Sequence, residues 1–226
     1  MPTTSRSTWS EELSSIEPNV VVVDHPVLAH RISVLRDERT DRDAFRQLVS
    51  EISRYLAYEA VRDLRLTEVI VTTPVARGAV TQRVDENVLV VPVLRAGLGM
   101  VQAIQEVVPF TDVAHVGLRR DEETFHSEVY LNRLPKDLTG RRVIVCDPML
   151  ATGGSLAQVC QLVRDRGADD VIALCVIASA PGVAAFVAAQ PTVRLYCAVI
   201  DPALNEVGYI VPGLGDAGDR LFGPPD

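Results

Sequence analysis

The strongest periodic pattern in the chain lies between Thr40 and Leu64. Apolar residues recur there at steps of three and four positions, the spacing that places them on one face of an α-helix. They are Phe45, Leu48, Val49, Ile52, Leu56 and Ala60. Thr40, with Asp43 three residues later, resembles a capping box in which Asp replaces Glu. The pattern therefore predicts a long amphipathic helix.

After this helix, short runs rich in β-branched residues alternate with helical patterns. Several of the runs are apolar throughout, as expected for strands that are covered on both faces. The runs are Glu68–Thr73, Val88–Val93, Asp112–Leu118, Arg142–Asp147, Asp170–Ile177 and Val193–Ile200, and the helical patterns are Leu98–Val108, Gly154–Arg166 and Pro181–Ala189. Pro181 suits the first position of a helix. This order predicts an α/β fold with a largely parallel central sheet flanked by helices.

Three stretches depart from that alternation. The N-terminus is rich in Ser and Thr and has no apolar run, so residues 1–18 are expected to be a flexible arm rather than a signal peptide. The polar stretch 119–138, with a candidate strand at Glu128–Arg133, predicts a β-hairpin flap. The C-terminal residues 205–226 hold five glycines and three prolines, too many for a long helix or strand. Residues 19–226 are expected to form a single domain.

Composition limits the classes of function. The net charge of −8 disfavours general nucleic-acid binding, because an acidic surface repels phosphodiester backbones. It does not exclude a small anionic substrate, since a few arginines in one cleft act within the ~8–10 Å screening length. No apolar run reaches the ~18 residues of a membrane span. The four cysteines form no C-x-x-C pair and the four histidines have no ligand spacing, so we expect buried thiols in a reducing cytoplasm and no protein-bound metal.

The segment Val143–Ser155 carries the strongest chemical signal. An apolar strand runs into Asp147, and a short loop then opens a helix at Thr152, Gly153, Gly154 and Ser155. Ligands of open α/β sheets bind beyond the carboxyl ends of the strands, and a small-residue loop at a helix N-terminus suits a phosphate. Asp147 is placed to accept hydrogen bonds from sugar hydroxyls. The alternative is an ordinary strand-to-helix turn, which would explain Thr-Gly alone better than the whole string.

Two further segments carry arginines. In Val90–Gly99, a buried strand ends in a glycine-bearing loop with Arg95, whose planar fork of donors suits a diphosphate. Gly117–Thr124 places Arg119 and Arg120 where a strand meets the expected flap. A surface arginine on a turn and a solvated charge run are the alternatives for these two segments.

The C-terminal segment Gly208–Arg220 contains a literal G-x-G-x-x-G at Gly213, Gly215 and Gly218. A dinucleotide site is excluded, because only eight residues follow and no second strand can complete the unit. A loop rich in exposed backbone N–H and C=O groups can instead match the donors and acceptors on the edge of a planar base.

Together these segments resemble the uracil phosphoribosyltransferase family. The resemblance is carried by DPMLATGGS (Asp147–Ser155), LRAGLGM (Leu94–Met100), RRDEET (Arg119–Thr124), GYIVPGLGDAGDR (Gly208–Arg220), DHPVLAHRISVLRD (Asp24–Asp37) and LAYEAVRDL (Leu56–Leu64). It covers the chain from about Asp24 onward. Asp147 is followed by Pro148, as in the uracil enzymes, where other phosphoribosyltransferases usually carry two adjacent acids.

The resemblance implies the type I phosphoribosyltransferase fold, with a small hood formed largely by residues 201–226. It implies conversion of uracil and 5-phosphoribosyl 1-diphosphate into UMP and diphosphate. Contacts to the sugar diphosphate are expected from Arg95, Arg120, Asp147, Pro148, Met149, Leu150, Ala151, Thr152, Gly153, Gly154, Ser155 and Asp216, and contacts to uracil from Ile210, Gly215, Asp216 and Ala217. The catalytic roles fall to Arg95, Arg120 and Asp216.

The resemblance also implies Mg²⁺, arriving with the sugar diphosphate, and a cytoplasmic homo-oligomer, with a GTP effector as in some relatives left open. Alternatives are a phosphoribosyltransferase for another base and a nucleotide-binding or RNA-binding regulator of this fold. The stretch Thr124–Tyr130 lacks the proline usual in the family's flap, so flap dynamics or oligomer contacts are expected to differ.

Overall fold

A computed structural model of the chain describes residues 18–120 and 127–224. The expected N-terminal arm lies outside the described residues except for Pro18. Residues 121–126 of the expected flap and the last two residues also lie outside them, as do the side chains of Arg120 and Ser127.

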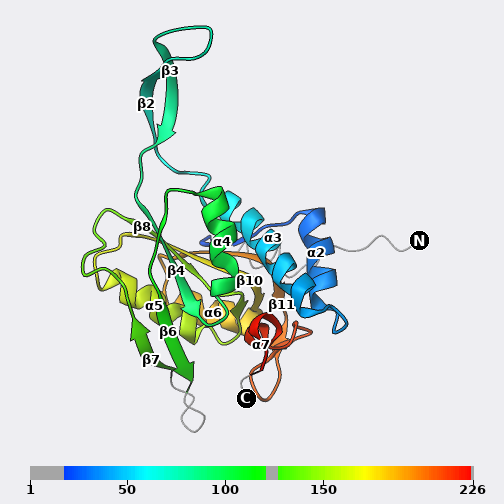
Figure 1. Ribbon diagram of the computed structural model, residues 1–226. Coiled ribbons are helices and arrows are strands. Elements are labelled where there is room, and N and C mark those ends of the chain that lie inside the picture. The colour runs from blue at the N-terminus through cyan, green and yellow to red at the C-terminus, as the bar shows by residue number, and fades with distance from the viewer. Residues whose placement is uncertain (1–17, 121–126, 225–226) are drawn as a thin grey trace.

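A nine-stranded sheet forms the centre of the molecule (Figure 1). Its main path runs β1-β11-β10-β8-β4-β6-β7, with β5 beside β4 and β9 beside β10. β7 pairs with β6 in the antiparallel sense, and the other pairs are parallel. The strands are β1 (Val20–Val22), β4 (Val88–Leu94), β5 (Asp112–Val113), β6 (Val116–Arg120), β7 (Ser127–Asn132), β8 (Arg142–Cys146), β9 (Met149–Leu150), β10 (Asp170–Ser179) and β11 (Arg194–Asp201). The predicted α/β class with a largely parallel sheet is confirmed.

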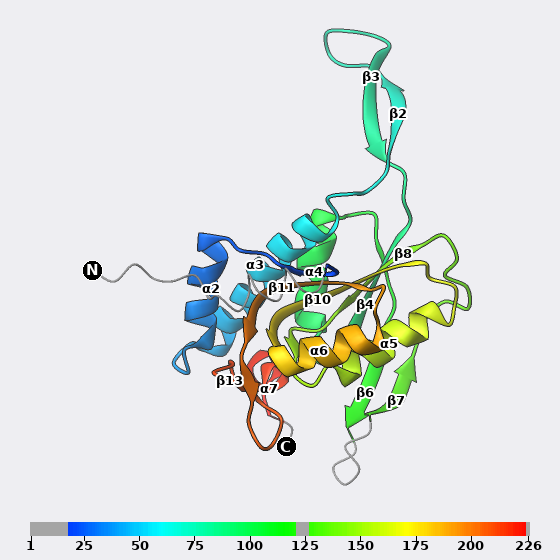
Figure 2. The same cartoon turned by 180° about the vertical axis from the view of Figure 1, so that it is seen from behind.

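Helices cover both faces of this sheet, which is why its central strands are apolar throughout. One face is covered by α2 (Pro26–Arg36), α3 (Arg42–Ala60), α4 (Leu98–Val107) and the short α7 (Ala217–Phe222). The other face is covered by α5 (Gly154–Arg164) and α6 (Ala180–Ala189), which lie in front in Figure 2. Alternate residues of β8 therefore enter different cores: Val143 and Val145 pack with α5 and α6, and Ile144 and Cys146 pack with α3 and α4.

Two predicted helix starts differ from the structure. Asp41, not Thr40, caps α3, and its carboxylate accepts a hydrogen bond from the backbone N–H of Ala44 at 2.9 Å. The Thr40 hydroxyl instead donates to the carbonyl of Val34 at 2.6 Å, in the last turn of α2. In α6, Ser179 is the cap, and Pro181 is the second rather than the first helical residue.

The run Glu68–Thr73 was expected beside the other strands, and that placement is wrong. It belongs to β2 (Leu66–Val71), which pairs only with β3 (Ala79–Val84) in a separate antiparallel hairpin. This β2–β3 hairpin projects away from the body of the molecule (Figure 1). It is rich in β-branched residues, as the buried strands are, yet most of its residues are exposed.

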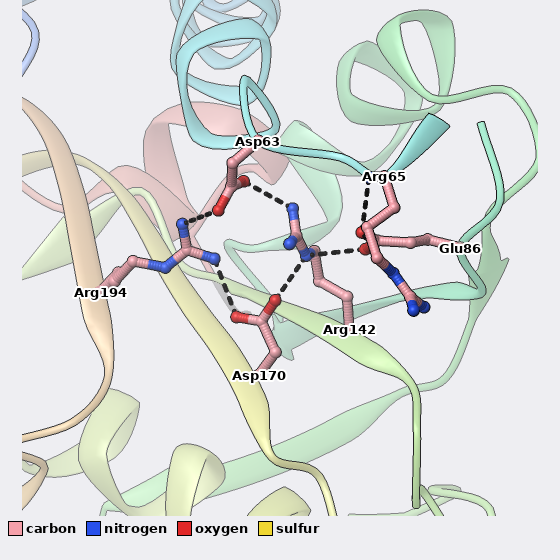
Figure 3. A network of polar contacts seen from close by, with 6 residues as sticks. All are labelled: Asp63, Arg65, Glu86, Arg142, Asp170 and Arg194. Atoms are coloured by element: carbon pink, nitrogen blue, oxygen red, sulfur yellow. Dashed lines mark hydrogen bonds and ion pairs between the residues drawn. The ribbon is translucent and has the colours of Figure 1, made fainter. Parts of the chain in front are cut away.

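A network of charged side chains fixes the base of the hairpin (Figure 3). The buried Arg142 guanidinium contacts Asp63 at 2.7 Å, Asp170 at 2.6 Å and Glu86 at 3.1 Å. Glu86, which follows β3, also accepts the backbone N–H of Arg65, which precedes β2, at 2.7 Å. Arg142, Asp170 and Arg194 begin β8, β10 and β11, so the network lies at the amino ends of the parallel strands, opposite the edge where ligands bind in such sheets.

The two other irregular regions also take up short elements. β6 and β7 form the expected hairpin of the flap, whose tip lies outside the described residues. The C-terminal segment, which is expected to form the hood, contains β12 (Ala203–Leu204), β13 (Ile210–Val211) and α7. No helix in the described part of the chain is both long enough and apolar enough to span a membrane.

Candidate functional site

The loop after β8 runs across the carboxyl edge of the sheet and leads into α5. Gly153, the residue before the helix, has a φ of +80°, a conformation that glycine adopts without steric cost. A Cβ atom at this position would lie 2.6 Å from the carbonyl oxygen of Gly182 in α6. Glycine is therefore required both by its backbone angle and by the close approach of α6.

Contacts from α6 hold the same loop in place. The Ser179 hydroxyl donates to the carbonyl of Ala151 at 2.6 Å and accepts the backbone N–H of Gly182 at 2.9 Å. Because Gly153 has no side chain, it cannot cap the first turn of α5 as Ser or Asp would. Since α5 begins directly after this loop, the positive end of its helix dipole faces the loop, as expected for a phosphate site.

The loop that carries Arg95 lies at the same edge, between β4 and α4. Gly97 brings it close to β8, since a Cβ atom at Gly97 would lie 2.4 Å from the carbonyl oxygen of Cys146. The Arg95 side chain is half exposed, and its Nη2 lies 3.2 Å from the Oδ1 of Asp219 in α7. The first arginine motif and the C-terminal motif are thus adjacent in space.

Two partly buried arginines fix the C-terminal segment to the body of the molecule. Arg36 at the end of α2 binds both carboxylate oxygens of Asp201, at 2.6 and 2.8 Å, and donates to the carbonyl of Gly213 at 2.8 Å. Arg220 donates to the backbone carbonyls of Leu35, Leu214 and Asp37, each at 2.8 Å, and lies over the ring of Phe45. These contacts make the hood a fixed part of the fold, although it contains little regular structure.

A pocket of about 390 Å³ lies between the loop after β8 and the C-terminal segment. Its lining residues come from both segments and are Asp147, Met149, Leu150, Ala151, Thr152, Gly153, Ser155, Leu156, Val207, Gly208, Tyr209, Gly215 and Asp216. Nine of these were predicted as site residues from the sequence. The structure therefore brings together the phosphate loop and the base loop, which are about sixty residues apart in the chain.

The remaining predicted site residues lie around this pocket. Arg95 lies near its C-terminal side, through the contact with Asp219. Pro148 in the loop after β8 and Gly154, the first residue of α5, do not line the pocket, and the side chains of Ile210 and Ala217 are buried. Arg120 ends β6, and its side chain lies outside what the structure describes, as do residues 121–124 of its motif.

Asp147 is the lining residue with the most altered acidity. Its pKa is raised to about 7, chiefly by burial and also by the Asp216 carboxylate, while a hydrogen bond from the backbone N–H of Met149 opposes both effects. Asp216 itself caps α7 by accepting the backbone N–H of Asp219 at 2.9 Å. Two carboxyl groups thus face one pocket, and their mutual repulsion disfavours the state in which both are ionised.

Four lining residues were not among the predicted contacts. Leu156 continues the phosphate loop into α5, and Val207, Gly208 and Tyr209 form a turn between β12 and β13. The motif Gly208–Arg220 marked the neighbourhood of this turn. Nothing in the local sequence indicates that residues 207–209 pass in front of the loop after β8.

The comparison with known families decides the family of the chain. The family model described as uracil phosphoribosyltransferase matches residues 22–224. This chain belongs to the uracil phosphoribosyltransferase family.

Individual relatives agree with this assignment. A uracil phosphoribosyltransferase of Symbiobacterium thermophilum is 48% identical over 204 residues, which cover 90% of this chain and 98% of the relative. One from Ligilactobacillus salivarius is 46% identical over 202 residues, or 89% of this chain and 97% of the relative. A solved structure of a protein from Aquifex aeolicus superposes with a TM-score of 0.85 at 34% identity, over 90% of this chain and 98% of that one. The fold is the type I phosphoribosyltransferase fold.

Proposed function

We propose that this uracil phosphoribosyltransferase family member joins uracil to the ribose of 5-phosphoribosyl 1-diphosphate in the pocket between the loop after β8 and the hood. The observation that carries the proposal is the composition of the pocket wall. One side is a glycine-rich loop at the N-terminus of α5, and the other is the backbone-rich segment that includes Gly208 and Gly215. The first suits a phosphorylated sugar and the second a planar base.

The reaction breaks the bond between the anomeric carbon and the diphosphate oxygen. It forms a bond from that carbon to a uracil ring nitrogen, whose proton is released. The anomeric carbon develops oxocarbenium character, as in glycoside chemistry. The protein then has to align the two substrates and stabilise the charge of the departing diphosphate, and it needs no covalent nucleophile.

Arg95 is the described cation best placed to meet the diphosphate. Its guanidinium is half exposed and lies beside α7, with a single 3.2 Å contact to Asp219. Exchange of that contact for a diphosphate oxygen would give a charge-assisted hydrogen bond worth ~1.5–3 kcal/mol. Arg120 is proposed for the same role on the basis of the family resemblance.

The pocket also fits Mg²⁺ carried by the sugar diphosphate. Among the described residues, no group of three or more His, Cys, Asp or Glu side chains could hold a metal ion alone. Mg²⁺ in phosphate chemistry is instead held by one or two carboxylates together with substrate oxygens and water. Asp147 and Asp216 are the two carboxylates that line the pocket, and the ion would neutralise charge on the diphosphate.

The test of the proposed function is an activity screen of uracil, cytosine, hypoxanthine and adenine with the sugar diphosphate. Uracil should be the preferred base, because cytosine replaces an acceptor by a donor at one edge position and leaves protein groups unpaired, at ~1–3 kcal/mol for each buried group. Equal turnover of cytosine or of a purine would contradict the assignment. The same assay with added GTP tests an effector role, which a GTP-dependent rise in rate would support.

We also propose that the chain forms a homo-oligomer through the β2–β3 hairpin. Leu66, Ile70 and Val80 are 55%, 77% and 66% exposed on it, and an isolated two-stranded hairpin is marginally stable in water. Exposed apolar surface of this kind marks protein–protein contacts. A second copy of the chain is the proposed partner. The four cysteines are free and buried, which suits the cytoplasmic location that the family resemblance implies.

A further inference from the structure

One wall of the pocket is the turn between β12 and β13. Three consecutive residues of this turn, Val207, Gly208 and Tyr209, line the pocket opposite the loop after β8. The flanking strands contribute only two residue pairs, Ala203 with Val211 and Leu204 with Ile210. The turn that forms this wall is therefore supported by a very short β-ladder.

Packing does not hold this wall in place. None of the residues 205–209 is buried, and Val207 and Tyr209 are 69% and 44% exposed. By contrast, the opposite wall is held by α6 through Ser179 and Gly182. A turn without buried side chains depends on its hydrogen bonds for its shape.

Asn205 supplies those hydrogen bonds. Its side-chain Oδ1 accepts the backbone N–H of Val207 at 3.2 Å and that of Tyr209 at 2.8 Å. Its backbone N–H donates to the carbonyl of Tyr209 at 2.8 Å, and its carbonyl accepts the N–H of Gly208 at 3.0 Å. The side chain of Asn205 thus holds both ends of the three-residue stretch that lines the pocket, as Asn commonly does in turns of this type.

We propose that Asn205 is a positioning residue for the base side of the pocket, acting through the backbone of Val207 and Tyr209. The inference rests on the proposed function. The turn leads directly into Ile210 and the segment with Gly215 and Asp216, whereas the phosphate side is built by α5 and α6. A loose turn should therefore weaken uracil binding more than it weakens binding of the sugar diphosphate.

The first test is Asn205→Ala. Two backbone N–H groups lose their acceptor, so we expect KM for uracil to rise by about tenfold, from two hydrogen bonds of ~0.5–1.5 kcal/mol each. KM for the sugar diphosphate and kcat should stay within about twofold, because the removed contacts act on binding of the base alone. The melting temperature should be unchanged, since Asn205 is exposed.

A matched control exists in the β2–β3 hairpin. The Thr73 hydroxyl also accepts two backbone N–H groups, those of Val75 at 3.3 Å and Ala76 at 3.0 Å. Thr73 lies between β2 and β3, in the hairpin that projects away from the body of the molecule (Figure 1). Thr73→Ala should leave both KM values at those of the parent.

Asn205→Asp is the rescue variant. A carboxylate oxygen accepts the same two N–H groups, and uracil is neutral, so KM for uracil should return to the parent value. Calorimetric titration with UMP gives a second readout that needs no turnover, and Asn205→Ala should weaken this affinity as well.

The outcomes separate the inference from the proposed function. If the parent uses uracil and Asn205→Ala has parental constants, the inference is wrong and the function stands. Equal rises in both KM values, or failure of Asn205→Asp to restore uracil binding, would also overturn the inference. Such results would indicate disruption of the whole pocket rather than of its base side. A parent that neither uses uracil nor binds UMP would overturn both.

Discussion

At the scale of single residues, Asp147 combines a position in the pocket with a raised pKa. Burial is the largest cause of the rise to about 7, and the Asp216 carboxylate adds to it. The protonated form is therefore favoured in the folded protein. Between pH ~4, the ordinary Asp pKa of the unfolded chain, and pH ~7, the folded protein binds more protons than the unfolded one. The free energy of unfolding consequently falls as the pH rises through this window.

Asp147→Asn should remove this penalty. The variant keeps an oxygen that can accept the backbone N–H of Met149, but it has no charge to bury. We expect the variant to melt near the parent temperature at pH 4 to 5 and at a higher temperature than the parent at pH 8. The expected gain in unfolding free energy at pH 8 is about 1–3 kcal/mol. Thermal melts across this pH range measure the effect, with the exposed Asp165→Asn as a control for loss of charge alone. A difference that does not change with pH would contradict the raised pKa.

Asp216 has a structural role and a predicted catalytic one, and a single substitution separates them. The structure confirms that it caps a helix, by accepting the N–H of Asp219, while its place in the pocket supports the second role. Asp216→Asn preserves capping, because Asn and Asp cap about equally well. If the charge serves the reaction, the rate should fall by ~10²-fold or more with an unchanged melting temperature. Steady-state kinetics beside a melting curve test this.

A matched control for Asp216→Asn is Asp41→Asn. Asp41 caps α3 in the same way, through the N–H of Ala44 at 2.9 Å, and does not line the pocket. It should keep the parental rate. Parental rates for both variants would assign Asp216 to structure, and the shared substrate contact would then fall to the backbone of Gly215 and Ala217.

At the scale of elements, the sequence predicted best where burial is complete. β4, β8 and β10 are apolar along almost their whole length because both faces are covered, and their runs were predicted within two residues. β2 was predicted as a strand but misplaced, since β-branched residues indicate an extended chain and not what it packs against. α2 was not predicted, because its apolar residues do not mark one face: Leu28, Ile32 and Leu35 are buried, whereas Val27 and Val34 are exposed.

In the site, too, features that are continuous in sequence could be predicted, whereas features that depend on contacts between distant residues could not. The loop Asp147–Ser155 is continuous in sequence, so its glycines, hydroxyls and acid could be recognised together. The wall formed by Val207 and Tyr209 depends on how the chain returns across the sheet edge, which Arg36, Asp201 and Arg220 determine through contacts between distant residues. Local spacing carries no signal for such contacts.

Gly153, in the loop after β8, is constrained both by its backbone angle and by the close approach of α6. Gly153→Ala combines an unfavourable φ with a Cβ atom placed 2.6 Å from the Gly182 carbonyl, so α6 or the loop must move. Gly140 has a φ of +72° with no atom within 4 Å of its would-be Cβ, so Gly140→Ala measures the cost of the backbone angle alone, ~1 kcal/mol. We expect Gly153→Ala to lose at least ~1 kcal/mol more, together with most activity. Equal melting temperatures for the two variants would show that the close approach to α6 is tolerated.

At the scale of the whole molecule, the charge network around Arg142 supports the β2–β3 hairpin at its base. Hairpins of this kind would be mobile without support, and here Glu86 ties the base of the hairpin to Arg142 at the amino edge of the sheet (Figure 3). The pocket lies at the carboxyl edge. A partner bound through the hairpin would therefore leave the pocket accessible to substrates.

The proposed oligomer contact lies on the exposed apolar face of the β2–β3 hairpin. Ile70 and Val80 are directly paired across β2 and β3, and both are exposed. Replacing both by Lys places two charges on the proposed contact, and burial of unpaired charge is strongly unfavourable. We expect the parent to sediment as a multiple of its 24.6 kDa chain and the Ile70→Lys/Val80→Lys variant to sediment as a monomer. The control adds the same charge at Val27 and Val34, which are 39% and 38% exposed on α2, and should keep the parental mass. A monomeric parent, or an oligomeric hairpin variant, would contradict the proposal, because the apolar surface of the hairpin would then have no part in assembly.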